Sequence, residues 1–389
     1  MDVVLYTLGW ASGWLLLCRP FGGPLSASPA SAEAVAVSAA PESASPALPP
    51  RAAPEPASPA LPPLSASKAS ADAVAVAVII PARNEASSIT GAIDALMSGW
   101  ASPDELVVVD DASEDATAAL ARERGVRVVS APALPAGWTG KNHACTVGVS
   151  ATTAPVLVFV DADVRLASVA LSGLCPNDDR LVSIQPWHDA APGRERLSVI
   201  PTLLATMGAG TWSIAGPRVQ ASAAFGPVLA MTRSGYERIG GHGAVRGEPL
   251  EDVAIAQLFR RVELHTGPTW ASFRMHPDGW RQQVEGWTRL LRPGMITVHP
   301  AVSLACVAWV ASLIGGISVS PWCYGISAVQ VWALGRRVGR FGPLTAACYP
   351  LSVVLLLVAM VCGFRRRVVW RGRTLSVPRT RAHGKSATH

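Results

Sequence analysis

The chain has 389 residues, of which 50% are hydrophobic and only 15% are charged, and a mean hydropathy of +0.31 argues against a purely soluble protein. Its excess of Lys and Arg over Asp and Glu, 33 against 27, lies mostly beside apolar segments and in the tail, which indicates membrane flanks and argues against nucleic acid as a partner. The seven cysteines are scattered, so neither a disulfide framework nor a zinc site is expected.

Two segments precede the first expected domain. Residues 1–20 are predicted to be an N-terminal transmembrane anchor, because an apolar run ends at an arginine with no small-x-small cleavage site directly after it. A cleaved signal peptide is the alternative at this length. Residues 21–72 are almost entirely Ala, Pro, Ser and Val and contain an internal duplication, so a disordered linker is predicted.

Strands and helices are expected to alternate over residues 73–292. Short apolar runs that end at polar or acidic residues are typical of buried parallel strands, and helical stretches lie between them. The expected strands are residues 74–80, 106–109 and 156–160, and the helices are 86–97 and 116–124. This order predicts an α/β domain with a Rossmann-like sheet and with ligands at the carboxyl ends of its strands.

Three nearly uncharged segments follow, at residues 297–318, 321–334 and 343–363. The first and third are long enough to span a bilayer, and the middle one is short. Residues 293–363 are therefore expected to form a transmembrane region and 364–389 a basic cytosolic tail. Basic residues favour a multi-pass protein of the cell membrane with its α/β domain in the cytosol, but both two and three crossings stay open.

The strongest local signal is a pair of carboxylates, Asp161 and Asp163, directly after the third expected strand. Hard oxygen ligands at this spacing suit Mg²⁺ or Mn²⁺ that completes its shell with the phosphates of a nucleotide. A solvated acidic turn is the simpler alternative, so the interpretation of this pair as a metal site depends on the other motifs of the chain.

Polar groups also follow the first two strands. Pro81, Arg83 and Glu85 come after the first, and Asp110 and Asp111 come after the second. Because the carboxyl ends of parallel strands meet at one edge of the sheet, all five are expected to contact a bound nucleotide. Helix N-capping is the alternative for the aspartate pair.

These motifs resemble those of a known family. IIPARNE, VVVDDASEDAT, VFVDAD and the later LED at residues 250–252 are similar, in order and spacing, to inverting GT-A glycosyltransferases of family 2 over about residues 77–292. LPAGWTGKNHAC, FGP, IGGH and SFRM resemble the branch with the diaponeurosporenoate (carotenoid) and hopanoid-associated enzymes. The resemblance implies a GT-A domain, a nucleotide-sugar donor with a UDP-sugar expected, Mg²⁺ or Mn²⁺, and a membrane lipid of isoprenoid origin as the acceptor.

Glu251 and Asp252 follow a glycine-rich segment and open a helical pattern at residues 253–260, where carboxylates face a cleft. Inverting transfer needs one base to take the proton of the acceptor hydroxyl. The family pattern implies that Asp252 is that base and that Glu251 lies toward the acceptor, with a capping pair as the alternative. Lys141 is expected to bring positive charge to the leaving diphosphate, unless it is a surface lysine at a helix start.

Two more residues are expected on the acceptor side. His242 is expected to line the acceptor cleft, whereas His143 and His188 are expected to be structural because their spacing fits no zinc site. Trp287 is expected to stack on a sugar or to flank a lipid tail. It ends the segment QVEGW, which resembles the Gln-x-x-Arg-Trp motif of processive family members with Gly286 in place of Arg.

The leading hypothesis is therefore a single sugar transfer to a membrane lipid. The departure at Gly286 argues against processive synthesis. A polyprenyl-phosphate or polysaccharide synthase is the alternative among enzymes, and a catalytically silent membrane scaffold is the alternative outside them.

Overall fold

The computed structural model describes residues 3–19, 74–98, 102–167, 170–171, 174, 179–214, 224–248, 250–363, 367–370 and 373–376. The predicted linker at residues 21–72 lies outside the described residues. Of the predicted tail, only β9 (Arg367–Trp370) and β10 (Arg373–Ser376) are described, and they pair as antiparallel strands.

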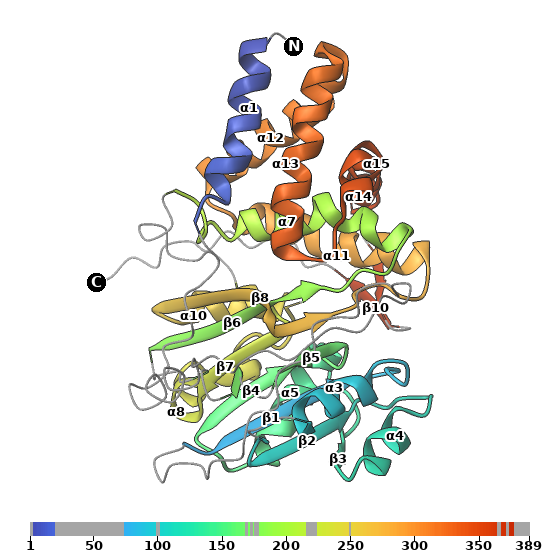
Figure 1. Cartoon of the computed structure of the whole chain (residues 1–389). Helices are drawn as coiled ribbons and strands as arrows, with labels where there is room; N and C mark the ends of the chain where they lie inside the picture. The colour runs from blue at the N-terminus through green and yellow to red at the C-terminus, as the bar shows by residue number, and fades with distance from the viewer. Residues whose placement is uncertain are drawn as a thin grey trace, which may run out of the picture.

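A mixed sheet of eight strands organises the described α/β domain (Figure 1). Its spatial order is β3-β2-β1-β4-β7-β6-β8-β5. The first four of these strands run parallel to their neighbours, β7 is antiparallel to β4 and β6, β6 is parallel to β8, and β5 is antiparallel to β8. The strands are β1 (Val76–Ala82), β2 (Glu105–Asp110), β3 (Arg127–Ser130), β4 (Val156–Val160), β5 (Val164–Leu166), β6 (Arg180–His188), β7 (Val228–Thr232) and β8 (Arg261–Phe273).

The predicted parallel strands are confirmed as β1, β2 and β4. All five residues of β4 are buried, because a central strand covered on both faces needs apolar side chains at every position. The sequence reasoning missed β3 and α5 (Gly140–Ser150), which lie between the second predicted helix and β4. An edge strand of four residues with exposed ends gives little signal.

Helices cover both faces of the sheet because successive side chains of a strand point to opposite faces. Val78 and Ile80 of β1 pack under α3 (Ile89–Met97), whereas Ala77 and Ile79 pack under α5. Gly148 permits the close approach of α5, since a Cβ there would overlap the Cγ2 methyl of Ile79. The remaining helices of this domain are α4 (Thr117–Glu123), α8 (Arg233–Arg238), α9 (Gly241–Ala244) and α10 (Glu251–Leu258).

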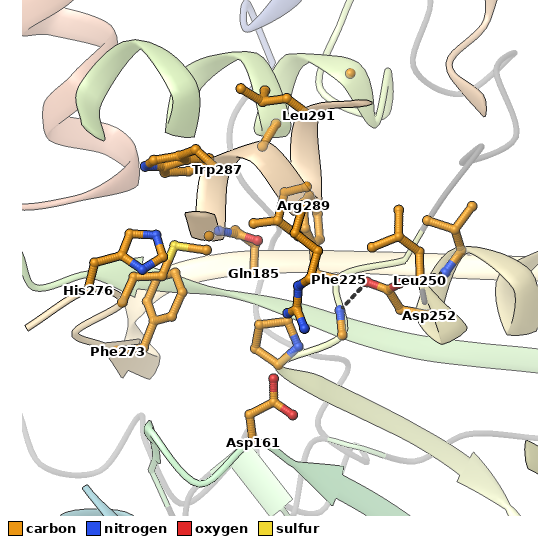
Figure 2. A pocket seen from close by; sticks show the side chains of 18 of the residues that line it. Asp161, Gln185, Phe225, Leu250, Asp252, Phe273, His276, Trp287, Arg289 and Leu291 are labelled. Atoms are coloured by element: carbon orange, nitrogen blue, oxygen red, sulfur yellow. Dashed lines mark hydrogen bonds between the residues drawn. The ribbon is translucent and has the colours of Figure 1, made fainter. Parts of the chain in front are cut away.

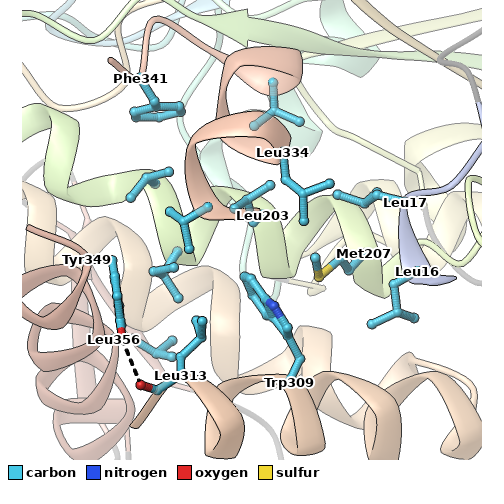
Figure 3. Close-up of a cluster of buried hydrophobic side chains, with 14 of the residues drawn as sticks. Leu16, Leu17, Leu203, Met207, Trp309, Leu313, Leu334, Phe341, Tyr349 and Leu356 are labelled. Atoms are coloured by element: carbon cyan, nitrogen blue, oxygen red, sulfur yellow. Dashed lines mark hydrogen bonds between the residues drawn. The ribbon is translucent and has the colours of Figure 1, made fainter. Parts of the chain in front are cut away.

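A second group of helices stands on the β6–β8 side of the sheet (Figure 1). Its central member is α7, and Figure 3 shows Leu203 and Met207 of α7 packed among side chains from α1, α12, α13 and α15. The group comprises α1 (Val3–Leu16), η1 (Arg194–Ser198), α7 (Val199–Gly208), α11 (Trp280–Thr297), α12 (Pro300–Val319), α13 (Pro321–Val338), α14 (Pro343–Ala347) and α15 (Tyr349–Gly363). The expected domain boundary at residue 292 falls inside α11, so the two parts share a continuous helix.

The N-terminal helix is seated on α12 by two glycines. A Cβ at Gly9 would lie 2.5 Å from the carbonyl oxygen of Ala308, and one at Gly13 would overlap the indole of Trp309. The Trp309 Nε1 donates to Gln330 Oε1 of α13 at 2.9 Å, and Gln330 Nε2 donates to the Trp10 carbonyl at 2.8 Å. Small residues spaced four apart allow this contact between backbones.

The helices that were expected to span a membrane have unequal lengths. Among the described residues, α12 is the one helix long and apolar enough to do so. The N-terminal α1 is apolar but has only 14 residues. The C-terminal α15 is apolar but has only 15 residues, because the third apolar segment breaks at Cys348. The middle segment extends to Val338 as α13 and includes Arg336 and Arg337. Multiple crossings therefore stay a prediction.

Candidate active site

The carboxyl ends of β1, β2 and β4 meet at a cavity of about 610 Å³. Two non-glycine residues near it, Asn84 and Ala112, have left-handed backbones with φ of 53° and 55°. Such backbones are uncommon outside glycine and cluster at functional sites. The Arg83 Nη1 donates to the carbonyl oxygens of Asp111 and Ala112 at 2.6 and 2.9 Å and so ties the two turns together.

Most of the predicted donor residues line this cavity, and so does Asp163, the second predicted metal ligand. The donor residues are Pro81, Arg83, Glu85, Asp111, Lys141 and Asp161. Asp110 does not, because its Oδ1 accepts a hydrogen bond from the Ser113 backbone N at 3.1 Å. This carboxylate oxygen closes the turn after β2, and a donor contact of Asp110 stays a prediction.

Lys141 joins two parts of the site that are far apart in the sequence. It lies in the first turn of α5, and its Nζ is 2.7 Å from both Asp161 Oδ1 and Glu251 Oε1. Burial alone would lower the pKa of Lys141, but the two carboxylates outweigh burial and hold that pKa well above its usual value. Lys141 is therefore a permanent positive charge within the site and not a surface lysine.

Asp252 is held with its carboxylate at the cavity wall (Figure 2). Its Oδ2 accepts from the Gly226 backbone N at 2.8 Å, and its Oδ1 accepts from the Val253 backbone N at 2.9 Å. A Cβ at Gly226 would lie 3.0 Å from Oδ2, so glycine permits this approach. Burial, and then the neighbouring Glu251 carboxylate, raise the pKa of Asp252 to about 6. A carboxylate with a pKa near neutrality suits a general base.

The two acceptor-side expectations have different outcomes. Trp287 lines the cavity, but it is 1% exposed and its Nε1 donates to Ser198 Oγ at 3.0 Å, so its ring is a fixed part of the wall. His242 is also 1% exposed but packs against Phe159 and hydrogen-bonds Tyr236, outside the cavity lining. His242 lies in the core after the left-handed Gly240, and its expected contact with an acceptor stays a prediction.

The far end of the cavity was not foreseen from the sequence. It is lined by side chains of α7, α12 and α15, including Leu204, Val310, Leu356 and Met360. Between this apolar end and the acidic end lie three polar side chains, Gln185, His276 and Arg289. They come from β6, from the loop after β8 and from α11, and no local motif connects them. Only the packing of α7 and α11 over the sheet brings them together.

The acidic end fits a divalent cation that shares its ligands with a phosphate. Asp161 and Asp163 line the same cavity and offer carboxylate oxygens, the ligand type that Mg²⁺ and Mn²⁺ prefer. In the part of the chain that the structure describes, no group of three His, Cys, Asp or Glu side chains forms a complete metal site by itself. The donor set therefore suits an ion that takes further ligands from water and a diphosphate.

A cavity lined by carboxylates and by Lys141 at the carboxyl ends of parallel strands is typical of nucleotide-binding domains of the mixed α/β type. The family model for glycosyl transferase family 2 matches residues 77–176. The chain is 31% identical to a 4,4'-diaponeurosporenoate glycosyltransferase of Staphylococcus haemolyticus over 78% of this chain and 88% of the relative, and 29% identical to one of Staphylococcus aureus over the same shares.

Similar solved structures include a mannosyltransferase from Pyrobaculum calidifontis in complex with GDP-Man and Mn²⁺, at 18% identity and a TM-score of 0.44, over 74% of this chain and 86% of that one. Glucosyl-3-phosphoglycerate synthase from Mycobacterium tuberculosis matches at 19% identity and a TM-score of 0.38, over 58% and 80% of the two chains.

The chain belongs to glycosyltransferase family 2, in the branch of the diaponeurosporenoate glycosyltransferases. It is a glycosyltransferase with a GT-A-like mixed sheet. The alternative of a catalytically silent membrane scaffold is therefore not adopted. The side chains of Asp161, Asp163 and Asp252 all line the cavity.

Proposed function

We propose that this enzyme transfers one sugar from a nucleotide diphosphate donor, with a UDP-sugar expected, to a lipid acceptor at the cytosolic face of the cell membrane. The observation that carries the proposal is the continuity of the cavity, which runs from the strand-end carboxylates past Asp252 to the apolar helices. The acceptor of the relatives, diaponeurosporenoate, supports a carotenoid-like lipid, and a hopanoid is the second candidate.

The donor is assigned to the acidic end of the cavity. Arg83, Glu85 and Asp111, at the ends of β1 and β2, would contact its nucleoside, together with Pro81. Asp161 and Asp163 would hold Mg²⁺ or Mn²⁺. When bound, such a cation neutralises the negative charge that develops on the leaving diphosphate.

Lys141 supplies a second positive charge on the leaving-group side. Because Glu251 and Asp161 already hold its ammonium group in place, little reorganisation is needed when the diphosphate leaves. Glu251 thereby positions Lys141, and it also lines the cavity next to Asp252, where the acceptor would approach.

Asp252 is assigned the proton-taking step. The acceptor oxygen forms a bond to the anomeric carbon of the sugar while the bond from that carbon to the diphosphate oxygen breaks, and an acceptor that attacks as a hydroxyl or as a carboxylic acid gives its proton to Asp252. A pKa of about 6 keeps most of the carboxylate ionised at pH 7 and therefore able to accept this proton.

The apolar end of the cavity is assigned to the acceptor chain. Leu204 of α7, Val310 of α12 and Met360 of α15 line it, and these groups match a hydrocarbon and offer it no hydrogen bonds. An isoprenoid chain in this position would place its polar head toward Asp252.

A membrane position is supported by the outer faces of the terminal helices. Large apolar side chains are exposed along α1, α12, α13 and α15. Examples are Leu5, Leu304, Ile317, Trp322, Val329 and Val361. Extended apolar surface is rarely exposed on proteins that face only water. We propose that these helices lie in the bilayer and make the protein multi-pass, so that the cavity opens beside the lipid that it uses.

The test is to incubate membranes that contain the protein with radiolabelled nucleotide sugars and Mn²⁺ or Mg²⁺, and to analyse the extracted lipids by mass spectrometry. We expect a singly glycosylated lipid from the wild type and none from Asp252→Asn. The proposal fails if the wild type labels no lipid with any donor. If Asp252→Asn labels as well as the wild type, the base role fails, as it would for an acceptor that attacks through an already ionised carboxylate.

A further inference from the structure

One wall of the cavity contains polar groups that the proposed chemistry does not use. His276 follows β8 and Gln185 lies on β6, and their exposed fractions are 4% and 7%. Both line the cavity (Figure 2). Within the described residues, both ring nitrogens of His276 are buried and have no hydrogen-bond partner. A buried polar group without a partner is unfavourable, so a ligand group that hydrogen-bonds these nitrogens would stabilise the site.

The surrounding structure holds the His276 ring in this position. A Cβ at Gly286 of α11 would overlap the ring and would lie 2.8 Å from its Nε2. The ring also meets Trp287 edge-on, with the ring centroids 5.8 Å apart. The Arg194 Nη1 donates to the His276 carbonyl at 2.8 Å and fixes its backbone. Gly286, where the processive motif has Arg, is therefore the residue that leaves room for His276.

The charge state of His276 limits what it can bind. Burial, and then the neighbouring His188, Arg289 and Arg194, lower the pKa of His276 to about 3. The ring is therefore neutral, with one nitrogen that donates a hydrogen bond and one that accepts. The Gln185 amide likewise offers both. Such groups match hydroxyls, which also donate and accept, and Phe273 and Trp287 add aromatic surface beside them.

We propose that His276 and Gln185 bind hydroxyl groups of the transferred sugar and thereby determine which donor sugar the enzyme accepts. The inference rests on the proposed sugar transfer. A sugar ring buried in this cavity needs polar partners, and the apolar end offers none. In Figure 2, His276 and Asp252 lie on opposite sides of the cavity, with Asp161 between and below them. A ring that extends from Asp252 toward His276 would present its hydroxyls to this wall.

The experiment compares donors in the full-length, detergent-purified enzyme. The preferred UDP-sugar of the wild type, its 4-epimer and its monodeoxy analogues are assayed for kcat/KM with one lipid acceptor. We expect the wild type to disfavour at least one analogue by about 10-fold or more, because its site hydrogen-bonds the missing hydroxyl. In His276→Phe, kcat/KM for the preferred sugar should fall by about 10- to 100-fold and the discrimination should fall to below about 3-fold.

Further variants separate recognition from misfolding. His276→Gln keeps a hydrogen-bonding group and should recover part of the discrimination, and Gln185→Leu should lose it. Gly286→Ala leaves His276 unchanged but displaces its ring, so it should imitate His276→Phe. The matched control is His265→Phe, which changes a buried histidine of β8 outside the cavity lining. The Kd of UDP should be the same in all of these proteins, because UDP has no transferred sugar.

Two results would overturn the inference and leave the proposed function intact. In one, His276→Phe keeps the wild-type ratios among sugars. In the other, it changes only the KM of the acceptor, which would assign the wall to the acceptor head. Failure of the wild type with every donor would refute the proposed function itself.

Discussion

Replacing Asp252 by Asn should abolish transfer and yet stabilise the folded protein above neutral pH. Burial and the Glu251 carboxylate raise the pKa of Asp252 from 3.8 to about 6. This difference corresponds to about 3 kcal/mol between the two protonation states. Below pH 3.8 the carboxyl is protonated in the folded and the unfolded chain, and the folded state loses up to this amount as the pH rises through about 6.

An Asn at position 252 does not lose this stability as the pH rises, since its side-chain amide does not ionise. It loses one of the two backbone hydrogen bonds, from Gly226 or from Val253, which costs about 1 kcal/mol. We therefore expect Asp252→Asn to be more stable than the wild type by about 2 kcal/mol at pH 8 and less stable by about 1 kcal/mol near pH 4. The sign of the difference should change between these values.

The matched comparison is the adjacent residue. Burial raises the pKa of Glu251, but Lys141 outweighs burial and the net pKa is lowered, so ionised Glu251 stabilises the fold above its unfolded pKa. Glu251→Gln should therefore be destabilised at pH 8, where Asp252→Asn is stabilised. Thermal unfolding by tryptophan fluorescence, in one detergent from pH 4 to 8, measures both. A melting temperature of Asp252→Asn below that of the wild type at pH 8, or a difference independent of pH, would refute the raised pKa.

Four further outcomes follow from the site. The kcat/KM of the wild type should rise with pH to a plateau, with a midpoint near pH 6, because Asp252 must be ionised to accept a proton. A flat pH profile of kcat/KM from pH 5 to 8 would contradict this role of Asp252. Lys141→Met should weaken UDP binding by about 10-fold or more and lower the melting temperature, since it leaves the carboxylates of Asp161 and Glu251 without their cation. An unchanged Kd of UDP in a calorimetric titration would reject this role of Lys141. EDTA should remove activity and Mn²⁺ should restore it, with a higher Mn²⁺ requirement in Asp163→Asn than in the wild type. Val310→Trp should reduce transfer to a long-chain acceptor more than to a short one, whereas Leu304→Trp on the exposed side of α12 should not, and equal effects would remove the acceptor chain from the cavity.

The acidic end of this site was largely readable from the sequence. β4 has the predicted bounds, Val156–Val160, because a run of apolar residues flanked by polar ones can be buried on both faces only as a central strand. The polar groups that follow each parallel strand share one edge of the sheet by geometry alone. Asp161 and Asp163 therefore line the cavity by their position after β4 alone, with no tertiary contact needed to bring them there.

Other features depended on contacts that no local pattern records. Periodicity does not show which way a short helix turns after Gly240, so the same sequence was compatible with His242 in a cleft or in the core. A carboxylate after a strand can face a ligand or close its own turn, and Asp110 closes its turn. Side-chain direction at such positions is decided by packing and by hydrogen bonds that form only in the folded chain.

The remainder of the cavity was decided by tertiary structure alone. Lys141 is joined to Glu251 because α5 and α10 begin at the same edge of the sheet. The apolar end exists because α7 packs between the sheet and the terminal helices. His276 reaches the cavity because Gly286 on α11 leaves space for its ring. The sequence determined the chemistry at the strand ends, since it follows from local burial, whereas long-range packing determined which distant side chains share a cavity with it.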